Sequence, residues 1–190
     1  PRIGAMWGKC DPENPKNRRR RCSVLIERFG KTGGVTRVLV DTPPDIREQL
    51  LDVRVDSIDA VVFTHDHADH THGIDDLRMV AYAMKRRIDA YFDGATRRSL
   101  VERFGYCFET PRGSGYAPIL NARDLVAGSA ITVDGQGGAI NITAIPQVHG
   151  DIASLGLRVG NVAYSPDVSK LPRAALPMLQ NLDVWSSEEH

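Results

Sequence analysis

The segment FTHDHADHTHG (63–73) constrains this chain more than any other feature, because it holds four of the six histidines together with two aspartates. It continues directly from the apolar run DAVVF (59–63), which is typical of a buried strand. Imidazole and carboxylate groups are good ligands for zinc, manganese and iron, and several must converge to bind a metal firmly. A solvated polar loop could also contain histidines, but H-x-H-x-D-H at the end of an apolar strand favours a metal site.

Short apolar runs separated by turn residues predict most of the secondary structure. Strands are expected at 22–28, 36–41, 58–65, 89–93, 140–147, 155–159 and 161–167. Helical patterns cover 45–53, 74–86 and 95–105, and Pro177 makes any helix over 172–180 short or kinked. The mixture predicts a layered α/β fold in one domain, residues 1–190.

Composition excludes several classes of partner. Lys and Arg total 24, as do Asp and Glu, so no net charge attracts nucleic acid, and nucleic acid is not an expected partner. No apolar run approaches the roughly 20 residues that span a bilayer, so no membrane association is expected. The three cysteines form no CxxC pair and the N-terminus shows no signal-peptide pattern, which together predict a cytoplasmic protein.

The segment HDHADHTHG resembles the H-x-H-x-D-H-x-x-G signature of the metallo-β-lactamase superfamily. Three further motifs resemble that family in the same order: Asp41 in VLVDTPPDIREQ, His149 in IPQVHGD and Asp167 in AYSPDVS. The stretches GIDDLR, DPENPKNRRRR and DTPPD are similar to one branch, the relatives of the cyclic phosphodiesterase of bacterial phosphonate breakdown. The resemblance implies a four-layer αββα sandwich with a metal site at one edge.

At the matching positions, the resemblance implies a site for two divalent ions, zinc or manganese, with iron also compatible. The implied ligands are His65, His67 and His149 for the first metal, Asp69 and His70 for the second, and Asp167 bridging both. A hydroxide between the metals would be the nucleophile, with Asp69 and Asp167 as catalytic residues. Asp41 would brace the metal loop, and His72, at a variable position of the signature, would support the site from behind the ligands or be structural.

The branch resemblance predicts a hydrolase that acts on a small cyclic or nucleotide-like phosphodiester. The basic run alone favours a solvated loop, whereas the branch resemblance implies that Arg18 and Arg19 bind the substrate phosphate. Another hydrolase of the superfamily, such as a lactonase, a thioesterase or an RNA-processing nuclease, remains an alternative. So does a catalytically inactive relative that keeps the metal loop.

The chain also departs from the family pattern. It is expected to lack the first strand of the fold and the part that follows LDVW, which carries a late histidine ligand of the second metal. His190 is the only histidine after His149, and its surroundings do not match that motif. A fragment, a partial sequence and a truncated member are equally compatible with this, and truncation would expose a sheet edge and favour a homodimer. Cys10 is alone in its loop, so the structural zinc of some relatives is not expected there.

Overall fold

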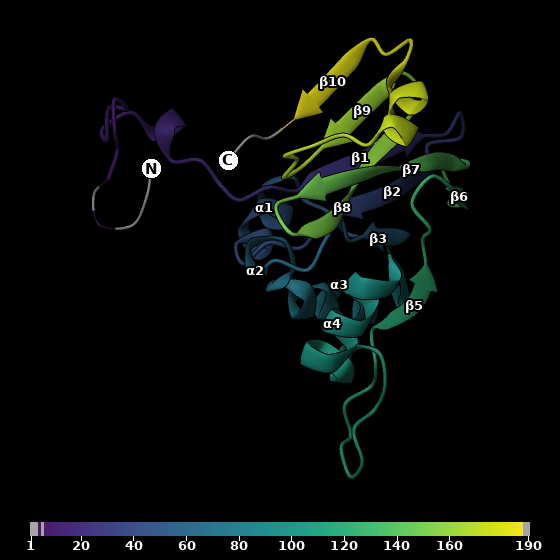
Figure 1. The fold of residues 1–190 in the computed structure, drawn as a ribbon. Helices are drawn as coiled ribbons and strands as arrows, with labels where there is room; N and C mark the ends of the chain where they lie inside the picture. The colour runs from purple at the N-terminus through teal and green to yellow at the C-terminus, as the bar shows by residue number, and fades with distance from the viewer. Residues whose placement is uncertain (1–3, 5, 188–190) are drawn as a thin grey trace.

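The computed structural model describes residue 4 and residues 6–187, which contain two five-stranded sheets (Figure 1). The first sheet has the order β1 (Val24–Phe29), β2 (Val35–Val40), β3 (Ala60–Val62), β4 (Ile88–Phe92), β5 (Leu120–Asp124). The second has the order β10 (Val184–Ser187), β9 (Val162–Ser165), β8 (Ile152–Val159), β7 (Ile140–His149), β6 (Ala130–Val133). Strands β2 to β5 are parallel and β1 is antiparallel to β2, whereas in the second sheet only β9 and β10 are parallel.

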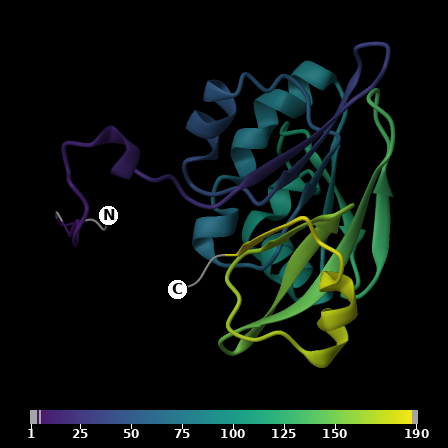
Figure 2. The ribbon, with the colours of Figure 1, turned by 90° about the horizontal axis from the view of Figure 1, so that it is seen from above.

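Helices cover the outer faces of the two sheets. The α-helices are α1 (Ile46–Asp52), α2 (Ala68–Thr71), α3 (Leu77–Met84) and α4 (Gly94–Phe104), and they lie together on one side of the sheets (Figures 1 and 2). Short 3₁₀ turns are η1 (Pro15–Asn17), η2 (Ile74–Asp76), η3 (Gly105–Cys107) and η4 (Arg173–Leu179). On the opposite side, Ala175 of η4 packs against Ile145 and Ala163 of the second sheet. The expected αββα layering is therefore confirmed.

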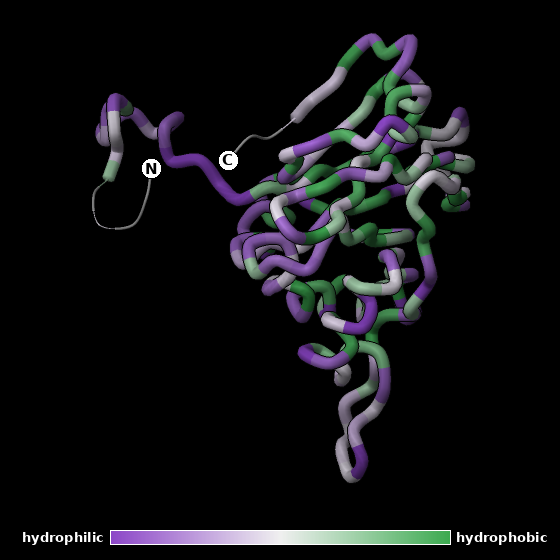
Figure 3. Tube along the Cα trace, viewed as in Figure 1, coloured by the Kyte–Doolittle hydropathy of each residue, from purple (hydrophilic) through white to green (hydrophobic). Residues whose placement is uncertain are grey.

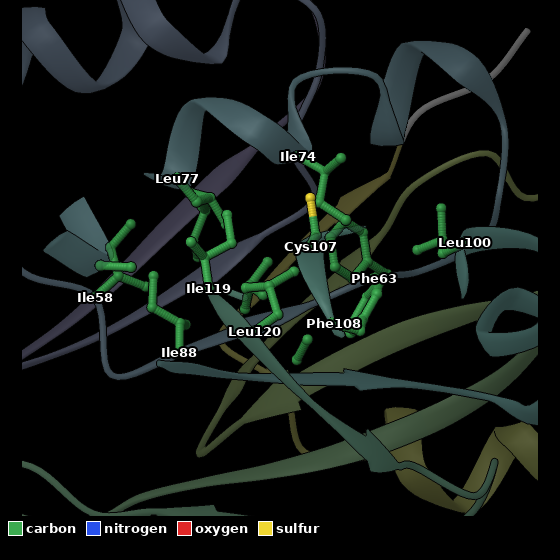
Figure 4. Close-up of a cluster of buried hydrophobic side chains, with 14 of the residues drawn as sticks. Ile58, Phe63, Ile74, Leu77, Ile88, Leu100, Cys107, Phe108, Ile119 and Leu120 are labelled. Carbon is green, nitrogen blue, oxygen red and sulfur yellow. The ribbon is translucent and has the colours of Figure 1, made fainter. Parts of the chain in front are cut away.

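Both faces of the first sheet are buried, as its nearly continuous apolar strands predict. Leu39, Val61 and Phe63 point towards the helices, in the cluster that Figure 4 shows in part. Their neighbours Val40 and Val62 point into the space between the two sheets. Figure 3 shows the apolar residues gathered in this body, whereas the N-terminal segment outside it is mainly polar.

The structure differs from the sequence expectations in a few elements. The strand expected at 58–65 is regular only over β3, and the residues after Val62 form the metal loop. The helix expected at 74–86 begins as η2 and ends as α3 before Lys85, whose φ of 55° is left-handed. Pro177 lies inside η4, which is a 3₁₀ helix rather than an α-helix. None of the described helices is long and apolar enough to cross a membrane.

Candidate metal centre

The loops that follow β2 and β3 begin at the same edge of the first sheet, because the two strands are parallel. The backbone N–H of Asp41, just after β2, donates to the carbonyl of Val62 at the end of β3 (2.9 Å). His65 follows β3, His67 is the N-cap of α2, and His70 lies in the last turn of that short helix. The sequence therefore brings three histidines and Asp41 to one sheet edge.

The metal loop is held tightly against the segment after β2. Thr42 N–H donates to the carbonyl of His70 (2.7 Å), and Gly73 N–H donates to the carbonyl of Thr42 (2.8 Å). A Cβ atom at Gly73 would lie 2.2 Å from the carbonyl oxygen of Pro43, which is closer than any side chain allows. The glycine that ends the H-x-H-x-D-H-x-x-G pattern is thus required for this backbone approach.

The second sheet contributes the other members of the centre. β7 ends at His149, and Asp167 lies two residues beyond β9. One ligand atom from each of His65, His67, His149 and Asp167 lies within 4.8 Å of the others. Asp167 Oδ2 is 3.5 Å from Nε2 of His65 and 3.5 Å from Nε2 of His149. The four residues expected around the first metal are therefore adjacent in space.

His70 reaches the same oxygen of Asp167, and its ring lies 4.3 Å from that of His65 between centroids. Its Nε2 lies 3.4 Å from Asp167 Oδ2, and its Nδ1 lies 2.8 Å from Asp41 Oδ2. Asp69 is half-buried beside it, with Oδ2 3.3 Å from a guanidinium nitrogen of Arg21. One oxygen of Asp167 thus lies within 3.5 Å of a ring nitrogen of His65, His70 and His149.

The chemistry of the buried nitrogens fits a divalent ion. Among the described residues, Nε2 of His65 and Nε2 of His70 have no hydrogen-bond partner although both are buried. Burial, together with the charges of His70 and His67, lowers the pKa of His65 to about 3, so its imidazole is neutral at neutral pH and able to bind a metal. Neutral imidazoles around a carboxylate form a donor set for zinc, manganese or iron.

Two carboxylates of the centre have a left-handed backbone. Asp41 has a φ of 59° and Asp167 a φ of 39°, a region that residues other than glycine rarely adopt. Asp41 is fully buried and accepts hydrogen bonds from Thr64 N–H (2.8 Å) and Thr64 Oγ1 (2.7 Å) besides its contact with His70. Burial lowers the pKa of His70, but the hydrogen bond to Asp41 and the charge of its carboxylate outweigh this and raise it. These contacts are those of a brace that orients His70 through Nδ1.

The remaining predicted residues lie farther out. His72 is exposed and its ring packs edge-on against Phe104, with centroids 5.7 Å apart. Arg18 and Arg19 are exposed, and within the described residues neither side chain makes an ion pair or hydrogen bond with the centre. Arg21 of the same basic run does reach it, through Asp69, whereas Arg20 pairs with Asp52 of α1. His190 lies outside the described residues.

Asp66, between the first two histidines, anchors the metal loop to α4. Its Oδ2 accepts hydrogen bonds from Ser99 Oγ (2.5 Å) and from a guanidinium nitrogen of Arg103 (3.1 Å). Arg103 also donates to the backbone carbonyl of Asp66 (2.7 Å). The sequence reasoning missed this support because Ser99 and Arg103, at i and i+4 on α4, look like an ordinary solvated helix face.

Comparisons with known proteins identify the family and the fold. The family described as Beta-lactamase superfamily domain matches residues 36–188. A solved structure described as a new diphosphatase from the PhnP family is 33% identical with a TM-score of 0.79, and the match covers 97% of this chain and 66% of that chain. Zn(2+)-bound PqqB from Methylobacterium extorquens shares the fold with a TM-score of 0.61 at 14% identity, over 90% of this chain and 60% of that chain.

One curated relative is named for a reaction other than that of the diphosphatase. An octanoyltransferase of Porphyromonas gingivalis is 28% identical over 181 residues, which are 95% of this chain but 35% of that protein. The chain thus spans about a third of this curated relative and somewhat less than two thirds of the PhnP-family diphosphatase. The family match runs from β2 through the metal loop, His149 and Asp167 to β10, and by this match the chain belongs to the beta-lactamase superfamily.

Proposed function

We propose that the protein is a metal-dependent phosphodiesterase that uses two divalent ions, zinc or manganese, on a small cyclic or nucleotide-like phosphodiester. The observation that carries this proposal is the position of Asp167. Its Oδ2 lies 3.5 Å from His65 Nε2, 3.4 Å from His70 Nε2 and 3.5 Å from His149 Nε2. A carboxylate so placed can be shared by two ions, which is how dinuclear hydrolases are built.

In this proposal each side chain has a defined role. The first ion would be held by His65, His67 and His149, the second by Asp69 and His70, and Asp167 would contact both. Two such ions generate a nucleophile from water near neutral pH and neutralise charge on a phosphoryl oxygen. Burial opposes ionisation of Asp69, but a backbone hydrogen bond and the charges of His70 and Arg21 lower its pKa, so its carboxylate is ionised and able to orient a water molecule.

Arg21 is the best-placed residue to bind the substrate phosphate. Its side chain is about half exposed (55%), and its contact with Asp69 uses one guanidinium nitrogen. The other N–H groups of the guanidinium are available to a phosphate at the same edge. Arg18 and Arg19 precede Arg21 in the same exposed segment, and their role in phosphate binding stays a prediction.

The 33% identity to a PhnP-family diphosphatase supports chemistry at phosphorus. Chemistry on an acyl group is the second candidate, and it rests on the relative named octanoyltransferase. It is the weaker one because this chain spans 35% of that protein, so the name describes a much longer polypeptide.

The test is turnover of bis(p-nitrophenyl) phosphate by protein loaded with zinc or manganese, beside a thioester and a lactone at equal concentration. We expect the diester to be the preferred substrate, and Asp167→Ala to lose at least about 100-fold in turnover together with bound metal. Asp183→Ala is the matched control, because Asp183 pairs with Asn161 just before β9 and lies away from the centre. Preference for the thioester would favour the acyl alternative, and an Asp167→Ala variant with full turnover and metal content would refute the bridging role.

A further inference from the structure

We infer that Trp185, Ser165 and Gln147 form a hydrogen-bonded positioning chain that sets the distance between two ligands of the proposed metal site, His149 and Asp167; Gln147 and Ser165 are buried, and Trp185 is 49% exposed. Gln147 Nε2 donates to Ser165 Oγ (2.5 Å), and Trp185 Nε1 donates to the same oxygen (2.9 Å). The inference rests on the proposed metal site and names residues that act through its ligands rather than on substrate.

Two residues of the positioning chain, Gln147 and Ser165, each precede one of the two ligands closely in the sequence. Gln147 precedes His149 by two residues on β7, so both side chains belong to the same face of that strand. Ser165 is the last residue of β9 and precedes Asp167 by two residues. Gln147 and Ser165 are almost completely buried, with exposed fractions of 2% and 0%. A shift of either side chain is therefore transmitted to the ligand that follows it.

The connection between Gln147 and Ser165 depends on a glycine in the strand between them. β8 separates β7 from β9 in the second sheet. A Cβ atom at Gly156 of β8 would lie 2.4 Å from Gln147 Nε2, so any other residue would occupy the space of the amide. The missing side chain lets Gln147 reach across β8 and tie β7 to β9 directly, in addition to the backbone ladder.

A contribution to core stability does not explain why Gln147, Ser165 and Trp185 are joined by hydrogen bonds. The carbonyl oxygen Oε1 of Gln147 is buried and has no hydrogen-bond partner among the described residues. An unpartnered buried amide oxygen opposes folding, and an apolar side chain of the same size would avoid the penalty. By contrast, Asp167 has a left-handed φ of 39°, which persists only where the surroundings enforce it. The hydrogen bond between Gln147 and Ser165, each two residues before a ligand, supplies that constraint.

The test separates positioning from folding in the full chain. Gln147→Met keeps the length of the side chain and removes the amide, and Gln136→Met, on the exposed turn between β6 and β7, is its matched control. Two quantities are measured on metal-free protein: the free energy of unfolding in urea, and the affinity and visible absorption spectrum on titration with cobalt(II). For Gln147→Met we expect unchanged or higher stability, about 10-fold weaker cobalt binding and an altered spectrum, because the ligands lose their support. Gln136→Met should match the wild type.

Trp185→Phe is a second, milder variant, because it removes the indole N–H and keeps an aromatic ring. We expect it to weaken cobalt binding about threefold to tenfold. Wild-type cobalt affinity and spectrum in both Gln147→Met and Trp185→Phe would overturn the inference. If the wild type binds cobalt but hydrolyses no phosphodiester, the proposed function fails, while the cobalt measurements still decide on the positioning chain.

Discussion

The protonation of His65 depends strongly on the fold. Burial and two neighbouring histidines lower its pKa to about 3 in the folded protein, from an ordinary value of 6.5. Between these values the unfolded chain binds a proton at His65 and the folded protein does not. The contribution of His65 to stability is therefore complete above about pH 6.5 and decreases as the pH falls towards 3.

We predict that the free energy of unfolding of metal-free protein falls more steeply with decreasing pH in the wild type than in His65→Gln. The difference in slope should approach about 1.4 kcal/mol per pH unit between about pH 6 and pH 4, because one proton is involved. Urea unfolding of both proteins after chelator treatment measures it. Parallel slopes would contradict the prediction.

The ligands could be predicted from sequence, and their supports could not. His65, His67 and His70 lie in one short segment whose density of donor groups indicates a metal. The contacts of Asp66 with Arg103, and of Gln147 with Ser165, join residues far apart in the sequence. No local pattern distinguishes such pairs from ordinary polar residues. For the same reason Arg18 and Arg19 were indistinguishable from Arg21 before the loop was placed beside Asp69.

At the scale of elements, the close contact between the metal loop and the segment after β2 depends on Gly73. We predict that Gly73→Ala lowers the free energy of unfolding by about 3 kcal/mol, because its Cβ would overlap the carbonyl oxygen of Pro43. Gly105→Ala is the control, since a Cβ there has no atom within 4 Å and the backbone is helical. Urea unfolding compares the two, and equal effects would show that the loop moves away easily.

The tie between α4 and the metal loop makes a separate prediction. Arg103→Ala should change the free energy of unfolding by no more than about 1 kcal/mol, because its ion pair with Asp66 is partly exposed. Amide hydrogens of residues 64–70 should nevertheless exchange faster, since the loop loses the bond to the Asp66 carbonyl. Arg97→Ala, whose partner Asp124 is away from the loop, is the control. Equal exchange in the two variants would contradict the anchoring role.

Strands and helices with a strong apolar pattern were predicted from the sequence. Strands that form mainly because they pair with a neighbouring strand were not. β2 (VTRVLV) and β3 (AVV) are rich in valine and continue into apolar neighbours, and both were recognised. β5 (LNARD) and β10 (VWSS) carry little apolar pattern, and they are strands because they pair in parallel with β4 and β9. α2 is a single turn that begins at the N-cap His67, too short for any periodicity.

At the scale of the whole molecule, the centre joins the two sheets. His65, His67 and His70 follow β3 of the first sheet, whereas His149 and Asp167 come from β7 and the end of β9 in the second. Two ions held by these residues, with Asp167 contacting both, would cross-link the two halves of the sandwich. Metal binding should then stabilise the entire fold rather than one loop.

We predict that metal at 100 times its dissociation constant raises the free energy of unfolding by about 2.7 kcal/mol for each ion bound, in the way expected for a ligand of the folded state. Hydrogen exchange should slow in β7 and β9 as well as in β3. Differential scanning calorimetry with and without chelator, together with exchange mass spectrometry, would measure both effects. Protection confined to residues 63–73 would contradict cross-linking of the sheets.

Elemental analysis of metal per chain, on protein purified without chelator, tests the dinuclear centre directly when the wild type is compared with His67→Ala. We expect about two zinc or manganese ions per wild-type chain, because Asp167 Oδ2 lies within 3.5 Å of His70 as well as of His65 and His149, and a clear loss in His67→Ala. A wild-type chain that binds one ion or none under these conditions, or a His67→Ala variant with the full amount, would contradict the claim that this cluster is a dinuclear metal centre.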